Sequence, residues 1–224
     1  MPADRSFRHA PARARWGLAA IGVVALAAAC PVRAQGVAAD WVLAALARPA
    51  PVRTEFVELR GSPLLKAPLR LSGEYRRPDA DTLVREVRSP YRETTTLRAG
   101  EATIARDGKA PRTFSLSRVP ELAGLQSSFG ALLSGDRVGI ERSYAVTAAG
   151  TRERWTLTLA PKDKALAARV RDIVLYGQGA ELRCIETRPA KGDLQRTLLA
   201  SAALAAKPGS DAKALEALCR TGAR

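Results

Sequence analysis

The side chains that enzymes commonly use for nucleophilic or acid–base chemistry are sparse in this chain and follow no catalytic pattern. Its single histidine is His9, which lies close to the N-terminus. Two carboxylate pairs could exchange a proton with a substrate, and they are Asp79 with Asp81 and Asp163 with Glu181. No spacing distinguishes these pairs from the acids of ordinary exposed turns. Because most nucleophilic triads and zinc sites depend on histidine, the sequence predicts neither an enzyme nor a metal site.

Two short motifs could suggest a cofactor or a nucleophile, but both are better explained as turns. Residues 177–179 read Gly-Gln-Gly and lack a phosphate-binding lysine. Residues 134–136 read Ser-Gly-Asp and follow a helical apolar pattern, so we interpret them as a helix end rather than a nucleophile elbow. We therefore expect no cofactor.

The first 34 residues have the layout of a secretory signal peptide. Arginines precede an apolar and glycine run of 14 residues from Trp16 to Ala29, and small residues come directly before Gln35. Such a run is short for a membrane span. An alternative is lipidation of Cys30, although alanine stands where that signal usually has leucine. We expect export, with residues 1–34 as a cleaved signal and residues 35–224 as one histidine-free domain.

The charge of the expected domain is strongly positive. Five of the 36 basic residues and one of the 22 acidic residues precede Gln35, which leaves 31 basic and 21 acidic residues and a net charge of +10. Arginines alternate with apolar or hydroxyl side chains, which is typical of a solvated sheet face that favours anionic headgroups or acidic partners. They are Arg70, Arg76, Arg85, Arg88, Arg92 and Arg98. We expect no nucleic-acid partner, because no aromatic stacking platform is evident.

Two cysteines, Cys184 and Cys219, lie within the expected domain and form no CxxC motif. In an oxidising compartment this pattern predicts one structural disulfide that ties a strand to the C-terminal helix. It would close a loop of about 35 residues. The alternative is two buried free thiols.

Alternation of apolar and polar side chains predicts a mainly antiparallel β protein. Leu69, Leu71, Gly73 and Tyr75 share one face of a strand, and the polar side chains between them share the other. Since short turns join successive strands, we expect a meandering antiparallel sheet. Its later strands are expected around residues 155–159, 169–176, 180–188 and 193–200.

Helical periodicity predicts three helices around this sheet. The first covers residues 37–48, and the last covers residues 211–220. A central helix begins near Pro120 and ends at Gly135, with an apolar stripe that must cover the concave face of the sheet. Residues 200–210 are interpreted as a connector. The stripe consists of Leu122, Leu125, Phe129 and Leu132.

Four blocks follow one another along the chain, and they are Leu71 to Pro78, Leu83 to Glu86, Leu132 to Asp136 and Trp155 to Asp163. The first reads apolar-x-Gly-x-aromatic-x-Arg-Pro, and the last contains W-x-L-x-L-x-P-K. In this order they resemble the periplasmic outer-membrane lipoprotein carrier family, LolA, over about residues 40–200. The resemblance implies a half-open β-barrel covered by lid helices. It also implies that acyl chains of lipoproteins travel from an inner-membrane ABC transporter to an outer-membrane receptor.

The resemblance places functional residues on this chain. The arginine before the proline is associated with holding the lid closed, and here it is Arg77, whose fork of donors could bond carbonyls at a helix C-terminus. We expect apolar side chains of the sheet to line the cavity and those of the central helix to form the underside of the lid. The sheet residues are Leu71, Tyr75, Leu83, Phe114, Leu116, Trp155, Leu157 and Leu159, and the lid residues are Leu122, Leu125 and Phe129.

The functional expectation is a monomeric periplasmic carrier, without cofactor, for acylated lipoprotein or another lipid. An acyl chain exposed to water costs about 0.8 kcal/mol per methylene, so transfer requires an apolar cavity. The alternative is an envelope adaptor or a lipid-anchored receptor on the same fold. A continuous apolar cavity would favour the carrier.

Overall fold

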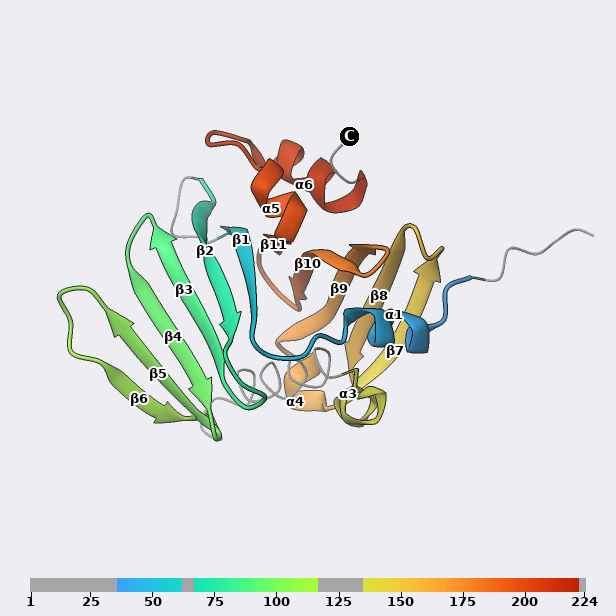
Figure 1. Ribbon diagram of the computed structural model, residues 1–224, viewed down its shortest axis with the longest axis horizontal. Helices are drawn as coiled ribbons and strands as arrows, with labels where there is room; N and C mark the ends of the chain where they lie inside the picture. Colours follow the sequence, from blue (N-terminus) through green and yellow to red (C-terminus); the bar gives the residue numbers. More distant parts are fainter. Residues whose placement is uncertain (1–35, 62–66, 117–134, 222–224) are drawn as a thin grey trace, which may run out of the picture. The chain divides into compact units, whose positions relative to one another are not determined.

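The computed structural model describes residues 36–61, 67–116 and 135–221, all within one compact unit of residues 35–224 (Figure 1). The expected signal peptide and the expected central helix, with Leu122, Leu125 and Phe129, lie outside the described residues. No helix in these described ranges is long and apolar enough to cross a membrane.

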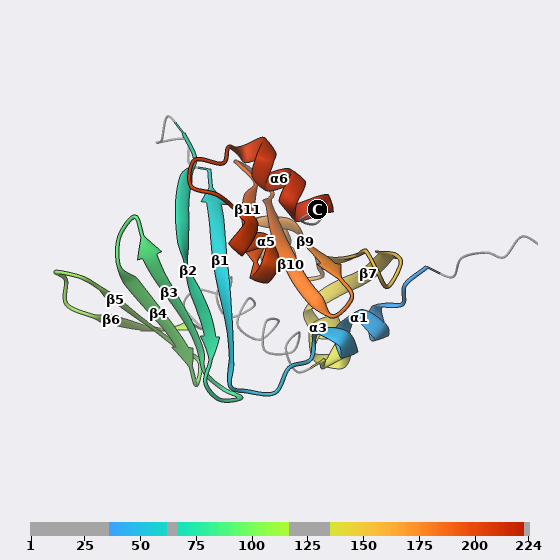
Figure 2. The ribbon, with the colours of Figure 1, turned by 45° about the horizontal axis from the view of Figure 1, so that its top comes forward.

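The described residues form one curved, unclosed antiparallel sheet of eleven strands, as predicted (Figures 1 and 2). Neighbouring strands run in the order β6-β5-β4-β3-β2-β1-β11-β10-β9-β8-β7, so the first and last strands of the chain pair in the middle and β6 and β7 form the two edges. The strands are β1 (Val52–Arg60), β2 (Leu69–Arg77), β3 (Leu83–Ser89), β4 (Glu93–Arg98), β5 (Glu101–Arg106), β6 (Arg112–Ser115), β7 (Tyr144–Gly150), β8 (Trp155–Pro161), β9 (Val170–Gln178), β10 (Glu181–Pro189) and β11 (Gln195–Leu199).

The strand registers sort the side chains onto two faces, because directly paired residues of neighbouring strands share a face. One row of paired residues runs through Leu157, Leu175, Ile185, Thr197, Glu58 and Leu71, and we name this side the α1 face. A second row runs through Thr156, Tyr176, Cys184, Leu198, Val57 and Ser72, and we name this side the α6 face. Different helices cover the two faces.

Helix α1 (Ala39–Leu46) lies within the predicted range of 37–48 and covers part of the α1 face. It buries Val42, Leu43 and Leu46, which pack in one cluster with Trp155 and Leu157. The chain then passes Pro49 and Pro51, which cannot continue a helix, and enters β1.

Helices α5 (Ala200–Ala205) and α6 (Ala212–Thr221) cover the α6 face over β1, β10 and β11 (Figure 2). The prediction that 200–210 is only a connector was wrong for its first half. Alanine is the best helix former, and Ala202 and Ala203 are small enough to be buried against Val57 and Leu198. Short helices α3 (Arg137–Ser143) and α4 (Lys164–Ala167) precede β7 and β9.

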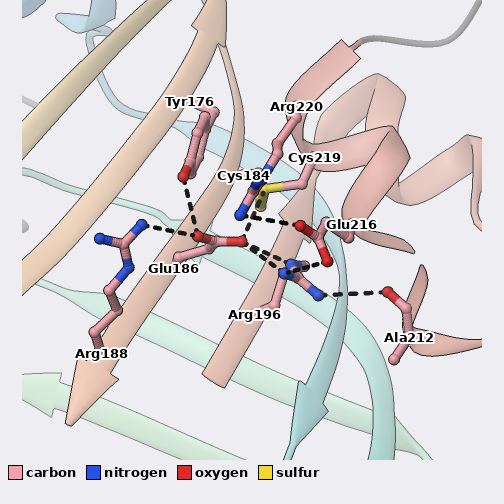
Figure 3. The surroundings of a disulfide bond; sticks show 9 residues. All are labelled: Tyr176, Cys184, Glu186, Arg188, Arg196, Ala212, Glu216, Cys219 and Arg220. Atoms are coloured by element: carbon pink, nitrogen blue, oxygen red, sulfur yellow. Dashed lines mark hydrogen bonds and ion pairs between the residues drawn. A yellow bond between two sulfur atoms is a disulfide. The ribbon is translucent and has the colours of Figure 1, made fainter. Parts of the chain in front are cut away.

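A disulfide joins Cys184 of β10 to Cys219 of α6, with Cα atoms 5.1 Å apart (Figure 3). Both half-cystines are buried in the cluster that α5 and α6 form with the sheet. The predicted covalent tie between a strand and the C-terminal helix is therefore present, and it fixes α6 to the centre of the sheet.

Candidate functional site

A cavity of about 490 Å³ lies where the end of α1 meets the ends of several strands. Its volume lies in the range of about 300–1,000 Å³ that is typical of small-molecule sites. The large apolar side chains that line it come from α1, β1, β2, β3, β10 and β11, and they are Leu46, Val52, Tyr75, Leu83, Leu182 and Leu199. A hollow of about 510 Å³ over β3, β4 and β5 is lined chiefly by charged side chains and is less suited to an apolar ligand.

Among the described residues, α1 covers only part of the α1 face, and the cavity lies beyond the end of this helix. Leu46 and Leu199 are buried in their own clusters, whereas Val52, Leu83 and Leu182 are only half-buried. When an apolar ligand binds at a concave site, it removes partly exposed apolar side chains from water, and this burial stabilises the complex. The cavity therefore offers apolar surface to a hydrocarbon ligand, beside the charged side chains that also line it, which are Arg48, Arg53, Arg76, Arg77 and Glu181.

Arginine side chains tie the end of α1 to both sides of the cavity. The Nη2 group of the buried Arg77, on β2, donates a hydrogen bond to the carbonyl of Arg48, just past the end of α1. The Nη2 group of Arg48 donates to the carbonyl of Ala180, in the β9–β10 turn, at 2.9 Å. The other fork nitrogen of Arg48 donates to the Ala45 carbonyl at 2.9 Å and to the Ala47 carbonyl at 3.1 Å, which satisfies the C-terminus of the helix.

A buried ion-pair cluster lies on the α1 face beside the cavity. Glu58 is 1% exposed, and its two carboxylate oxygens accept hydrogen bonds from Arg60 at 2.7 Å and from Arg85 at 3.1 Å. The Arg85 guanidinium also stacks 4.8 Å from the centre of the Phe56 ring. The interpretation of Arg85 as part of a solvated face was therefore wrong, since the register places it opposite Tyr75 on the core side.

The titratable groups of this cluster are either buried or paired with one another. Burial raises the pKa of the Tyr75 phenol, so this side chain stays neutral at physiological pH. Glu58 is held by two arginines and has no open position for proton transfer to a substrate. The described residues contain no group of three histidine, cysteine or acidic side chains arranged to hold a metal ion.

The structure separates the residues that the sequence proposed for the cavity. Tyr75, Arg77 and Leu83 line it together. Five others are buried in clusters elsewhere in the sheet, and they are Leu71, Leu116, Trp155, Leu157 and Leu159. Phe114 packs against the cluster of Leu116 near the β6 edge.

Four of the large apolar lining residues were not anticipated from the sequence. Leu46 belongs to the first predicted helix, Val52 to an unpredicted strand, and Leu182 and Leu199 to predicted strands. Their apolar character was visible, but periodicity alone does not show which strand ends the helix leaves uncovered.

Fold and cavity together define a class, namely unclosed antiparallel β-sheet proteins with helices on the sheet and an apolar-lined cavity. The family model described as outer membrane lipoprotein carrier protein LolA-like matches residues 29–222, and the chain therefore belongs to the LolA-like family. This confirms the resemblance found in the sequence blocks.

The chain is similar to the crystal structure of the LolA superfamily protein NE2245 from Nitrosomonas europaea, with a TM-score of 0.38 and 11% identity. That match covers 73% of this chain and 92% of the other. A comparison with curated proteins gives no match.

Proposed function

We propose that this protein is a periplasmic carrier that shields the acyl chains of lipoproteins, or of a related lipid, and transfers them from the inner to the outer membrane. The observation that carries the proposal is the cavity of about 490 Å³ with six large apolar lining side chains at the end of α1. Membership of the LolA-like family supports a carrier rather than an enzyme. An inner-membrane ABC transporter as donor and an outer-membrane receptor as acceptor belong to the same proposal.

Hydrocarbon burial provides the affinity that a carrier needs. Each methylene moved from water into the cavity contributes about 0.8 kcal/mol, so ten methylenes contribute about 8 kcal/mol. The half-buried Val52, Leu83 and Leu182 would lose their remaining exposure to water in the same step. The affinity for cargo thus comes from buried apolar surface area rather than from specific polar contacts.

Release of cargo requires that the contacts closing the cavity contribute less free energy than the whole binding of the cargo. Arg77 donates to the carbonyl of Arg48, and Arg48 donates to the carbonyl of Ala180, so both bonds close the end of α1 over the cavity. Hydrogen bonds with a charged donor contribute about 1.5–3 kcal/mol each, which a donor or acceptor protein can overcome on docking. Arg77 is accordingly proposed as the latch.

Mass spectrometry of protein purified from the periplasm of the native host tests the proposal directly. We expect bound acylated lipoprotein or another lipid, and an N-terminal mass that starts at Gln35 after removal of the signal peptide. A first residue at a lipidated Cys30 would instead assign the protein to a membrane-tethered receptor. Consistently empty protein that takes up no apolar probe would favour an envelope adaptor.

Variants that fill the cavity sharpen this test. Leu83→Trp and Leu182→Trp place a larger side chain in the cavity, while Leu204→Trp alters a residue that is 77% exposed on α5. We expect the two cavity variants to bind a fluorescent fatty-acid analogue roughly tenfold more weakly, about 1.4 kcal/mol, with the control unchanged. Equal affinity in all three folded variants would contradict the assignment of the cavity.

A further inference from the structure

A second, smaller pocket lies on the α6 face between α6 and strands β8, β9 and β10, and we name it the arginine pocket. Its volume is about 130 Å³, several times the roughly 30 Å³ that a water molecule occupies in the liquid. Three arginines line it, and they are Arg154, Arg183 and Arg220. Among the described residues that line it, none is aspartate or glutamate.

Arg183 is the residue that points to a ligand in this pocket, because it is a buried cation without a charge partner among the described residues. Its exposed fraction is 6%, and its Nη1 group donates to the Oε1 atom of Gln178 at 3.2 Å. The Nε and Nη2 groups are buried and have no hydrogen-bond partner in the described parts of the chain. Burial of an unpaired charge costs several kcal/mol, so such a group normally has a ligand or a counter-ion.

The two unpartnered nitrogens lie on the same edge of the guanidinium. The N–H groups of Nε and Nη2 point in parallel from that edge, which is the geometry that binds two oxygens of one oxyanion. Arg183 occupies a β-bulge of β10, where the register shifts between Leu182 and Cys184. Bulges re-aim side chains and are common beside functional sites.

Two acids beside the disulfide, whose Cys219 lines the arginine pocket, already have other partners (Figure 3). Glu186 is fully buried and accepts from Arg196 at 2.9 Å and from the Tyr176 hydroxyl at 3.0 Å. Glu216 pairs with Arg220 at 3.0 Å on the surface of α6. Neither carboxylate forms an ion pair with Arg183 within 4.0 Å among the described residues, so neither compensates its charge.

We propose that the arginine pocket binds a phosphate group. A phosphate carries up to two negative charges and several acceptor oxygens, which match the free edge of Arg183 and the guanidinium groups of Arg154 and Arg220. The source is either free phosphate or the phosphate of a lipid headgroup. This site is separate from the apolar cavity, although Gln178 of the β9–β10 hairpin lines both, and it does not depend on the proposed carrier function.

Isothermal titration calorimetry of the purified protein with inorganic phosphate at low salt tests the proposal. We expect saturable binding to the wild-type protein and at least a roughly tenfold loss of affinity in Arg183→Met. Arg183→Lys keeps the charge but loses the two-nitrogen edge, and we expect it to bind more weakly than the wild type. The matched control is Arg98→Met, which removes the same charge from an exposed position of β4 and should bind normally.

Vesicles distinguish the two sources of phosphate. Flotation with vesicles of phosphatidylglycerol and phosphatidylcholine, compared with phosphatidylcholine alone, measures binding to a lipid phosphate with net negative charge, because choline neutralises the phosphate of phosphatidylcholine. Arg183-dependent binding to phosphate in solution supports a free anion, and Arg183-dependent binding only to the anionic vesicles supports a headgroup. Absence of both, or equal binding by folded Arg183→Met and Arg98→Met, overturns the proposal.

Discussion

Removal of the disulfide provides a quantitative test of how the α6 face is held together. The change is the double substitution Cys184→Ala with Cys219→Ala, which opens a link between residues separated by 35 positions. In the chain-entropy model a loop of this length stabilises the folded state by about 3.8 kcal/mol at 25 °C, because the cross-link restricts the unfolded chain. Both half-cystines are also buried, at 0% exposure for Cys184 and 2% for Cys219, so the loss of their sulfur atoms removes packing beneath α5 and α6.

The expected effect is a fall of about 4 kcal/mol in the free energy of unfolding. For a domain of 150–250 residues this corresponds to a fall of about 8–15 °C in Tm. Urea unfolding followed by circular dichroism and by tryptophan fluorescence measures the change, with reduced and oxidised wild-type protein as the matched pair. Hydrogen exchange in α6 shows whether the helix loosens on its own before the sheet unfolds.

Two outcomes would refute the reasoning. A loss of less than about 1 kcal/mol would show that the cross-link does not restrict the unfolded chain as the loop length requires. A folded variant that no longer binds a fatty-acid probe would show that the two faces of the sheet are coupled. The disulfide lies on the α6 face, and we expect the cavity beside α1 to bind the probe with unchanged affinity.

Three further predictions concern the latch, the sheet and pH. Arg77→Lys loses the fork that bonds the carbonyl at the end of α1, and stopped-flow fluorescence should show roughly tenfold faster probe uptake; an unchanged rate contradicts the latch. Gly73→Ala places a Cβ atom 1.8 Å from a carbonyl oxygen of β3 and should cost about 3 kcal/mol in urea unfolding, while Gly36→Ala, with nothing within 4 Å, should be neutral. Burial raises the pKa of the Tyr75 phenol, so the unfolded state loses the phenol proton at a lower pH than the folded state does. The free energy of unfolding should therefore hold below pH 10 and fall above it. Urea midpoints measured at each pH would show this fall, which should be less steep in Tyr75→Phe.

Those parts of the fold that depend on local periodicity could be predicted from the sequence. The alternation of Leu69, Leu71, Gly73 and Tyr75 predicted a strand, and β2 covers Leu69–Arg77. The pairing of Cys184 with Cys219 followed because the expected domain has no other cysteine. Both inferences need only neighbouring residues or a count.

The buried charges could not be predicted, because they depend on how distant strands are aligned. Glu58 interrupts the apolar pattern of β1, and its burial makes sense only beside Arg85 of β3 and Thr197 of β11. The burial of Arg183 could not be predicted either, because the β-bulge that takes this residue out of the strand pairing has no signal in the local sequence. The face on which a side chain lies follows from its position along the strand, but its partner follows from how neighbouring strands are aligned.

The cavity shows the same division between local pattern and tertiary arrangement. Leu157 and Tyr75 both lie on the α1 face, yet only Tyr75 lines the cavity, because α1 packs over Leu157. The sequence predicted the apolar face correctly, and it could not predict where the helix ends on that face.

The two faces differ in how firmly their helices are fixed, and this locates the part that can open. On the α6 face, α6 is held by a disulfide in addition to its buried side chains. On the α1 face, detachment of all of α1 would expose Val42, Leu43 and Leu46, each contributing about 1.5–3 kcal/mol by burial. Release of its C-terminal end alone breaks the bonds of Arg77 and Arg48 to carbonyls, at about 1.5–3 kcal/mol each, and leaves Val42 and Leu43 packed. We therefore expect the proposed carrier to open by movement of the chain that follows α1, with the helix and the sheet remaining in place.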